Sequence, residues 1–207
     1  MIVIVDYGLG NISAFVNIYK KLNISVRVVS TSSELSYAEK IILPGVGSYD
    51  WAMKQLNDSG MRDTLDNLIL KSHVPVIGIC VGMQMMAKRS DEGKLDGLGW
   101  INAEVKHLGK TADIDKSNLP HMGWNDVLPV KKSPLFLGLE KDAKFYFLHS
   151  YFFSHSDESQ VLSYTEYNKL FASSVNYKNI FGVQFHPEKS HHWGIQLLKN
   201  FAEIKTC

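Results

Sequence analysis

The sequence predicts an α/β fold with an open, largely parallel central sheet that is flanked by helices, and with additional strands in the second half. Short apolar runs rich in valine and isoleucine recur along the chain, which is typical of strands that are buried on both faces. Between these runs, apolar residues follow the three- and four-residue spacing of helices that lie on a sheet. Because no repeat and no Pro/Gly/Ser-rich linker interrupts the 207 residues, we expect a single domain over residues 1–207.

Strands and helices alternate in the first half of the chain. The runs I-V-I-V and V-I-G-I-C predict buried strands, whereas Ile12, Phe15 and Tyr19 share one face of a helix. Pro44-Gly45 and Ser59-Gly60 provide breaks between elements. The expected order is a strand at residues 2–6, a helix at 12–22, strands at 26–29 and 40–44, helices at 51–56 and 61–70, a strand at 76–80 and a short helix at 82–87.

The second half is richer in strands. From about residue 91 to residue 118 the helical spacing fades, and short apolar runs follow. We expect strands at residues 145–149, 161–165, 171–175 and 180–185, and a closing helix at about 193–204. Since active sites of open α/β sheets collect at the carboxyl ends of the strands, residues that follow these strands are the first candidates for chemistry.

The composition argues against several classes of protein. There are 22 basic and 21 acidic residues, which leaves no basic excess for binding nucleic acid or an anionic membrane surface. No apolar run reaches the roughly 18–20 residues that span a bilayer, and the first residues read as a strand rather than a signal peptide. The two cysteines, Cys80 and Cys207, are too few for a disulfide framework. We therefore expect a cytoplasmic protein without nucleic-acid or membrane partners, and Cys207 receives no role.

The motif G-I-C-V-G at residues 78–82 predicts a nucleophilic cysteine on a sharp turn between a strand and a helix. It is the cysteine counterpart of the G-x-S-x-G nucleophile elbow. Glycines two residues to either side of Cys80 allow neighbouring backbone to approach closely, and the start of a helix beneath the sulfur favours the thiolate. The backbone N–H of Val81 then faces the position where an oxyanion would form. A buried structural cysteine at the end of a core strand is the alternative.

A second motif supplies the base that a thiolate nucleophile needs. His186 and Glu188 follow the expected strand at residues 180–185, so the imidazole can reach Cys80 at the same sheet edge, with the carboxylate holding its tautomer. Taken alone, a strand-end histidine capped by a local acid is more often structural. The loop Pro44-Gly45-Val46-Gly47 ends another strand at this edge, and its backbone N–H groups suit a second oxyanion donor.

Together these residues resemble the class I (triad) glutamine amidotransferases, which combine a G-x-C-x-G elbow with a distant His-Pro-Glu and a glycine-rich loop. Within that family, the motifs are most similar to those of the glutaminase subunits of imidazole glycerol phosphate synthases. The motifs follow the family's order and are D-Y-G-L-G-N at residues 6–11, L-P-G-V-G at 43–47, H-M-G-W-N at 121–125, F-Y-F-L-H-S-Y at 145–151 and Q-F-H-P-E-K-S at 184–190.

The resemblance implies a role for each matching position. Cys80 would be the nucleophile, His186 the general base and acid, and Glu188 the group that orients the imidazole. The backbone N–H groups of Val46 and Val81 would form the oxyanion hole. The residues implied to hold the glutamine substrate are Gly47, Gln84, Glu92, Ser150 and Tyr151. Neither a cofactor nor a metal is implied.

The resemblance also implies a reaction and a partner. L-glutamine would be hydrolysed to glutamate and ammonia, and the ammonia would pass to a (β/α)8-barrel cyclase subunit in histidine biosynthesis. Such a transfer requires a heterodimer, because ammonia released into solvent becomes ammonium, which is not a nucleophile. The residues implied to contact that partner are Asn11, His121, Met122, Trp124, Asn125, Tyr146 and Lys189.

Three alternatives remain at this point. The segments at residues 47–50, 99–100 and 189–194 are similar to a paralogous branch that supplies ammonia for the amidation of surface sugars. Gly8-Leu9-Gly10 after the first strand would suit a dinucleotide-binding module, although Ser13 occupies the third glycine position of that motif. A metal site formed by His186, His191 and His192 would lack a clear third or fourth ligand, because the last two point apart on a helix.

Overall fold

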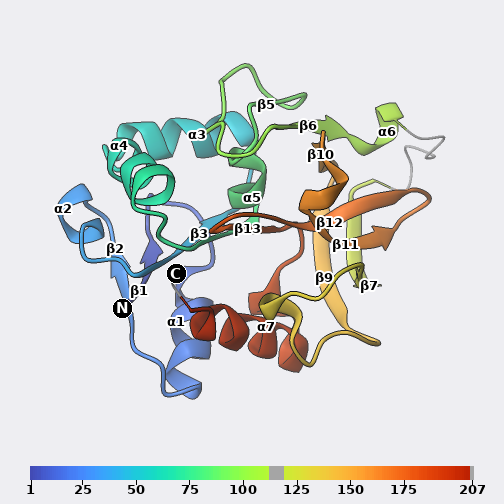
Figure 1. The fold of residues 1–207 in the computed structure, drawn as a ribbon. Coiled ribbons are helices and arrows are strands. Elements are labelled where there is room, and N and C mark those ends of the chain that lie inside the picture. The colour runs from blue at the N-terminus through green and yellow to red at the C-terminus, as the bar shows by residue number, and fades with distance from the viewer. Residues whose placement is uncertain (112–118, 206–207) are drawn as a thin grey trace.

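The computed structural model of the chain describes residues 1–111 and 119–205, so Cys207 lies outside the described residues. Within them, an eight-stranded sheet has the order β2-β1-β3-β4-β13-β12-β11-β8 (Figure 1). The first five strands in this order are parallel, and the last three continue the sheet in antiparallel pairing. The strands are Ile2–Val5 (β1), Val26–Val29 (β2), Lys40–Gly45 (β3), Val76–Cys80 (β4), Leu128–Pro129 (β8), Val161–Glu166 (β11), Leu170–Tyr177 (β12) and Ile180–Val183 (β13).

Helices cover both faces of this sheet. In Figure 1, α1 and α7 lie on one side of it, and α3, α4 and α5 lie on the other. The helices are Ile12–Lys21 (α1), Ser32–Leu35 (α2), Tyr49–Asp58 (α3), Arg62–Asp66 (α4), Val81–Met85 (α5), Leu108–Thr111 (α6) and His191–Glu203 (α7). A π-helical turn, Asn67–Lys71 (η1), continues α4, and short 3-10 turns are Pro134–Phe136 (η3), Glu158–Gln160 (η4) and Pro187–Lys189 (η5).

Two smaller sheets extend the second half of the chain. One has the order β10-β6-β5 and the other pairs β7 with β9. Their strands are Arg89–Ser90 (β5), Ala103–His107 (β6), His121–Asp126 (β7), Lys144–His149 (β9) and Tyr151–His155 (β10). Figure 1 shows β7 and β9 side by side, away from the helices α3 and α4. Of these five strands the sequence predicted only β9. The β7 segment H-M-G-W-N-D was missed because it lacks the β-branched residues that mark a strand.

The predicted α/β fold class is confirmed, and apart from the short elements that were not predicted the differences lie at element ends. All four residues of β1 and all five of β4 are buried, as expected for central parallel strands with helices on both faces. The helix expected at residues 51–56 runs from Tyr49 to Asp58, because Ser48 in extended conformation precedes its first turn. The strand expected to reach residue 185 ends at Val183. Across the described residues, no helix combines the length and the apolar character that crossing a membrane requires.

Candidate active site

Cys80 lies on the turn between β4 and α5, as the motif predicts. Its backbone has φ 54° and ψ −110°, a region that residues with a side chain rarely adopt. Such strain is retained where the surrounding structure fixes it, which is common at functional sites. Val81 is the first residue of α5, and an N–H in the first turn of a helix has no partner within the helix.

The backbone around this turn is packed too closely for side chains. A Cβ at Gly82 would lie 2.0 Å from the Leu43 carbonyl oxygen, and a Cβ at Gly45 would lie 2.3 Å from the Gly82 nitrogen. In the pairing of β3 with β4, Gly45 is opposite Cys80. Glycines at these positions therefore bring the end of β3, and with it the Val46 backbone, next to the cysteine.

His186 and Glu188 reach Cys80 from the neighbouring strand. β13 pairs in parallel with β4, so the segment after Val183 emerges at the same sheet edge as Cys80. The His186 side chain lies near enough to Cys80 for the sulfur to raise the pKa of the imidazole, and its Nδ1 donates to Glu188 Oε1 at 2.9 Å. Both side chains are almost fully buried, with 4% and 2% exposed. The backbone N–H of His186 donates to the Tyr146 carbonyl at 2.8 Å, which holds the histidine in place.

The surroundings of His186 favour its protonated form. Burial opposes the charge on the imidazole, but hydrogen bonds with Cys80 and Glu188, together with their negative charge, raise the pKa of His186 to about 10. A carboxylate accepts only, so Glu188 fixes the proton on Nδ1 and directs Nε2 towards the sulfur. An imidazolium beside a thiolate is the arrangement that makes a cysteine nucleophilic at neutral pH.

A pocket of about 110 Å³ opens next to this triad. All five residues that were predicted to bind glutamine line it, and the pocket also contacts Cys80 and Val81. Two further lining residues, Leu148 and His149, were not predicted, although they stand directly before Ser150 in the sequence. The lining residues are Gly47, Cys80, Val81, Gln84, Glu92, Leu148, His149, Ser150 and Tyr151.

Glu92 gives one wall of the pocket an acidic character. The backbone N–H of Tyr49 donates to its Oε2 at 3.0 Å, and burial raises the pKa of Glu92 above its ordinary value, with Asp50 adding to the effect. The carboxylate of Asp50 in turn accepts from the backbone N–H groups of Lys94 and Leu95. The loop that carries Glu92 is thus held in place before any ligand arrives.

Gln84, another lining residue of the pocket, is fixed by hydrogen bonds. Its Nε2 donates to the Tyr151 carbonyl and to Gln184 Oε1, both at 3.1 Å. Because these two bonds use both amide protons, its Oε1 is the atom that can contact a bound substrate. Gln184 lies within residues 184–190 of the sequence motif but had no predicted role; its own Nε2 donates to Cys80 Sγ at 3.7 Å.

Comparisons with known proteins agree with this geometry. Residues 3–204 match the family described as glutamine amidotransferase class-I. The chain belongs to the class I glutamine amidotransferase family. Its relatives include the proteins named imidazole glycerol phosphate synthase subunit HisH from Bdellovibrio bacteriovorus and Leptospira interrogans. The first is 56% and the second 47% identical to this chain, and each match covers 99% of this chain and 100% of the relative.

Solved structures of this family share the fold. A glutamine amidotransferase structure has a TM-score of 0.72 and 19% identity, with 97% of each chain covered. A second, from Thermotoga maritima, has a TM-score of 0.63 and 19% identity, covering 98% of this chain and 82% of the other. The predicted family resemblance is confirmed by the family match and the full-length relatives, and the fold class also by these structures.

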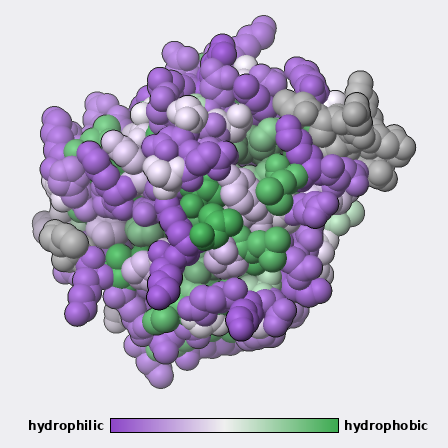
Figure 2. Space-filling model, turned by 45° about the vertical axis from the view of Figure 1, so that its right-hand side comes forward, coloured by the Kyte–Doolittle hydropathy of each residue, from purple (hydrophilic) through white to green (hydrophobic). Residues whose placement is uncertain are grey.

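The residues predicted to contact a partner fall into two groups. Met122 and Trp124 on β7 are 64% and 47% exposed, whereas His121 on the same strand is only 2% exposed and faces inwards. Trp124 lies edge-on to Tyr146, and the Lys189 ammonium lies 5.6 Å from the centre of that same ring. Figure 2, which turns the β7–β9 side of the molecule forward, shows hydrophobic residues gathered on a mostly hydrophilic face.

Asn11 and Asn125 complete the predicted set. Asn11 is exposed and directly precedes α1, a helix that contacts η5 behind the triad. The Asn125 side chain is half-buried and donates to the Glu166 carbonyl at 2.8 Å. The structure therefore places the side chains of His121 and Asn125 within the fold rather than on the exposed face of β7.

Gly10 and His191, which belong to the dinucleotide and metal alternatives, have packing roles. A Cβ at Gly10 would lie 2.7 Å from the Pro44 side chain, so this glycine lets the loop after β1 pack against the end of β3. His191 stacks on Trp124 with ring centres 5.2 Å apart. Within residues 1–111 and 119–205, no group of three or more His, Cys, Asp or Glu side chains could hold a metal ion.

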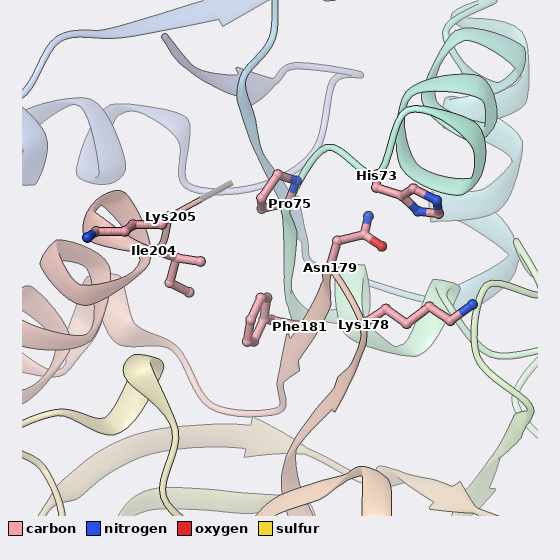
Figure 3. A pocket seen from close by; sticks show the side chains of 7 residues that line it. All are labelled: His73, Pro75, Lys178, Asn179, Phe181, Ile204 and Lys205. Carbon is pink, nitrogen blue, oxygen red and sulfur yellow. The ribbon is translucent and has the colours of Figure 1, made fainter. Parts of the chain in front are cut away.

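A larger cavity lies away from the triad. It has a volume of about 540 Å³ and opens where β4 and β13 begin, at the opposite sheet edge from Cys80. Figure 3 shows its lining side chains, which are His73, Pro75, Lys178, Asn179, Phe181, Ile204 and Lys205. The Asn179 amide is already bonded to the Ile69 and Val74 carbonyls, and the lining contains neither a cysteine nor a carboxylate side chain, unlike the triad.

Proposed function

We propose that this chain is the glutaminase subunit of an imidazole glycerol phosphate synthase. It hydrolyses L-glutamine and delivers the ammonia to a (β/α)8-barrel cyclase subunit in histidine biosynthesis. The observation that carries the proposal is the placement of Cys80 beside the hydrogen-bonded pair His186 and Glu188, next to a pocket with an acidic wall. The names of relatives up to 56% identical over nearly the whole chain support the choice of pathway.

The first half of the reaction forms a thioester. The Cys80 thiolate attacks the side-chain carboxamide carbon of glutamine, and the backbone N–H groups of Val46 and Val81 stabilise the resulting oxyanion. His186 then gives its Nε2 proton to the amide nitrogen, the C–N bond breaks, and ammonia leaves. Glu188 stabilises the imidazolium and keeps its Nε2 directed at the reacting atoms.

The second half releases glutamate. The neutral His186 accepts a proton from water, which attacks the thioester carbon, and the oxyanion again forms between Val46 and Val81. Collapse of this intermediate expels the Cys80 thiolate and restores the thiolate–imidazolium pair. This step requires a reduced thiol, and we place the enzyme in the cytoplasm, where thiols stay reduced.

Substrate recognition follows from the walls of the pocket. The Glu92 carboxylate is the counter-charge for the substrate ammonium, since an ionised acid makes short, strong hydrogen bonds with it. Gln84 Oε1 offers a second acceptor in the same pocket. The backbone at Gly47, Ser150 and Tyr151 lines the same space and suits the substrate carboxylate.

The partner is expected to dock over β7 and β9. Met122 and Trp124 expose apolar surface on the strand pair that holds His186 through Tyr146, so ammonia leaving His186 would emerge near this face. Aromatic anchors such as Trp124 commonly dominate the binding energy of an interface. Lys189 and Asn11 would supply polar contacts at its rim.

Glutamate release tests the proposal. The chain is assayed with L-glutamine alone, then with a (β/α)8-barrel cyclase subunit of an imidazole glycerol phosphate synthase and that cyclase's phosphorylated substrate, with Cys80→Ala as the control. The proposal expects glutamate release that depends on Cys80, and conversion of the histidine-pathway intermediate when both subunits are present. If hydrolysis occurs but only a sugar acceptor is aminated, the chain belongs to the surface-sugar branch. Glutamate release by Cys80→Ala at the parental rate would overturn the mechanism.

A further inference from the structure

A continuous set of buried hydrogen bonds connects the inner face of β7 to the Cys80 sulfur. It begins at Asn125, whose Nδ2 donates to His121 Nε2 at 3.2 Å. His121 Nδ1 and His149 Nε2 are 3.0 Å apart, and His149 Nδ1 lies 2.8 Å from the Tyr151 carbonyl oxygen. We name these three side chains, Asn125, His121 and His149, the histidine relay.

The partners determine every proton position in the histidine relay. A carbonyl oxygen only accepts, so His149 donates from Nδ1 to Tyr151 and its Nε2 accepts from His121. His121 then carries its proton on Nδ1 and accepts from the Asn125 amide at Nε2. Burial lowers the pKa of His121 to about 4 and that of His149 to about 3, so both rings are neutral, as this pattern requires.

The relay continues to the nucleophile through two glutamines. The Tyr151 carbonyl that accepts from His149 also accepts from Gln84 Nε2. Gln84 donates to Gln184, and Gln184 donates to Cys80 Sγ. The hydrogen bonds therefore reach both the glutamine-binding wall at Gln84 and Tyr151 and the sulfur that attacks the substrate.

Packing alone does not explain why His121 and His149 are buried here. His121 is 2% exposed and stacks between Phe147 and Tyr167, with ring centres 4.7 and 4.0 Å away. A phenylalanine would fill this space between the two rings without bringing polar atoms into the interior. Buried polar atoms that are left unpaired cost about 1–3 kcal/mol. Two adjacent buried histidines therefore serve their hydrogen bonds rather than the packing.

We propose that His121 and His149 are positioning residues for the glutaminase reaction. They hold the Tyr151 carbonyl, and through it Gln84, Gln184 and Cys80, in the geometry that the reaction needs. This inference rests on the proposed function and adds two residues that have no hydrogen bond of their own to Cys80 or His186 among the described residues. Because His121 and the exposed Met122 are neighbours on β7, any shift of this strand also changes the His121–His149 bond.

The test replaces His121 and reads two properties of the full chain. His121→Phe keeps the ring stacking but removes the donor to His149, whereas His121→Asn keeps a donor close to the position of Nδ1. His155→Phe is the matched control, because His155 is mostly buried on β10, outside the relay, and bonds to Glu158. The readouts are kcat and KM for glutamate release and the rate of Cys80 alkylation by iodoacetamide, which needs no turnover.

Misplacing reacting groups by about 1 Å costs on the order of a hundredfold in rate, so His121→Phe should lower kcat by about tenfold to a hundredfold. Alkylation of Cys80 should slow as well, because the Gln184 amide no longer aligns with the thiolate. His121→Asn should recover most of both rates, and His155→Phe should leave both unchanged. A folded His121→Phe with the kinetics of His155→Phe would overturn the proposal.

Two further results separate the possible failures. If His121→Phe does not fold, Asn125→Leu breaks the relay at its half-buried outer end, and the inference expects a several-fold loss in kcat; parental kcat in that variant would contradict it. If the parent chain releases no glutamate, the proposed function fails. The relay is then judged by alkylation alone, where equal rates in the parent and in His121→Phe would refute it.

Discussion

The elbow around Cys80 and the β7–β9 strand pair position the same chemistry by different physical means. At the elbow, backbone atoms of the β3 end and the α5 start pack directly against each other, so there is no room for a Cβ at Gly45 or Gly82. In β7–β9, side chains determine the arrangement through stacked aromatic rings and the histidine relay. A backbone-built site is rigid and insensitive to pH, whereas a site built from imidazoles depends on protonation. We therefore expect the elbow to be sensitive to any side chain added at its glycines, and the β7–β9 pair to be sensitive to acid.

The greatest loss of activity is expected from changing the orienting carboxylate. Glu188→Gln removes the charge that stabilises the His186 imidazolium and lets the amide donate to the wrong ring atom, so kcat should fall by about 10³–10⁴-fold with little change in KM. The matched control is Glu158→Gln, since Glu158 also bonds to a histidine but lies on the surface. A kcat within threefold of the parent in Glu188→Gln would contradict the proposed triad.

A second substitution tests the rigidity of the elbow. In Gly82→Ala the new Cβ would lie 2.0 Å from the Leu43 carbonyl oxygen, so the free energy of unfolding should drop by about 3 kcal/mol, as in other overpacked cores. Gly60→Ala is the control: Gly60 has a φ of 70° but nothing within 4 Å of the added Cβ, so we expect a loss of about 1 kcal/mol. Urea denaturation of both variants measures the difference, and equal losses would contradict the close-packing argument.

A smaller effect is expected at the exposed face of β7. Trp124→Ala should weaken binding to the barrel subunit by about 2 kcal/mol, close to thirtyfold, while unfolding changes by less than about 0.5 kcal/mol. Trp51→Ala on α3 is a close control, since Trp51 is 50% exposed and Trp124 is 47% exposed. Titration calorimetry of each variant with the barrel subunit gives the comparison. Equal affinities for the two variants would move the interface away from β7.

The pH dependence of stability should separate the histidine relay from the catalytic His186, and near neutral pH neither should change the free energy of unfolding much. The pKa values of His121 and His149 are lowered by burial, and His149 also faces His186, so the stability that their neutral forms contribute is complete above about 6.5. It falls as pH drops towards about 4 and 3. The pKa of His186 is raised to about 10, so its contribution is complete below about 6.5 and is lost as pH rises through about 10.

Denaturation between pH 4 and pH 10 measures both losses of stability, which we call the acid limb and the alkaline limb of the stability profile. His121→Phe should flatten the acid limb and leave the alkaline limb unchanged, because it removes one neutral imidazole from the interior. Glu188→Gln should flatten the alkaline limb, because it removes the partner that holds His186 protonated. An acid limb of parental steepness in His121→Phe would show that other groups are responsible for acid sensitivity.

The same contrast determines what could be predicted from the sequence. The elbow was predictable because glycine spacing, a strand and a helix start are local features, and the strand edge then brought His186 and Glu188 beside Cys80. The substrate residues came from the family resemblance, and the pocket collects all five. The histidine relay was not predictable, because β7 carries no strand pattern and the His121–His149 bond joins residues whose pairing depends on the β7–β9 register.

Nucleophilic catalysis by Cys80 can be tested by quenching the chain with acid during turnover of L-glutamine in the presence of the barrel subunit, digesting it at acidic pH and analysing the peptides by mass spectrometry. We expect a covalent glutamyl adduct on the peptide that contains Cys80, present in the parent and absent in Cys80→Ala. Glutamate release without any adduct in the parent, and at an equal rate in Cys80→Ala, would contradict a thioester on Cys80.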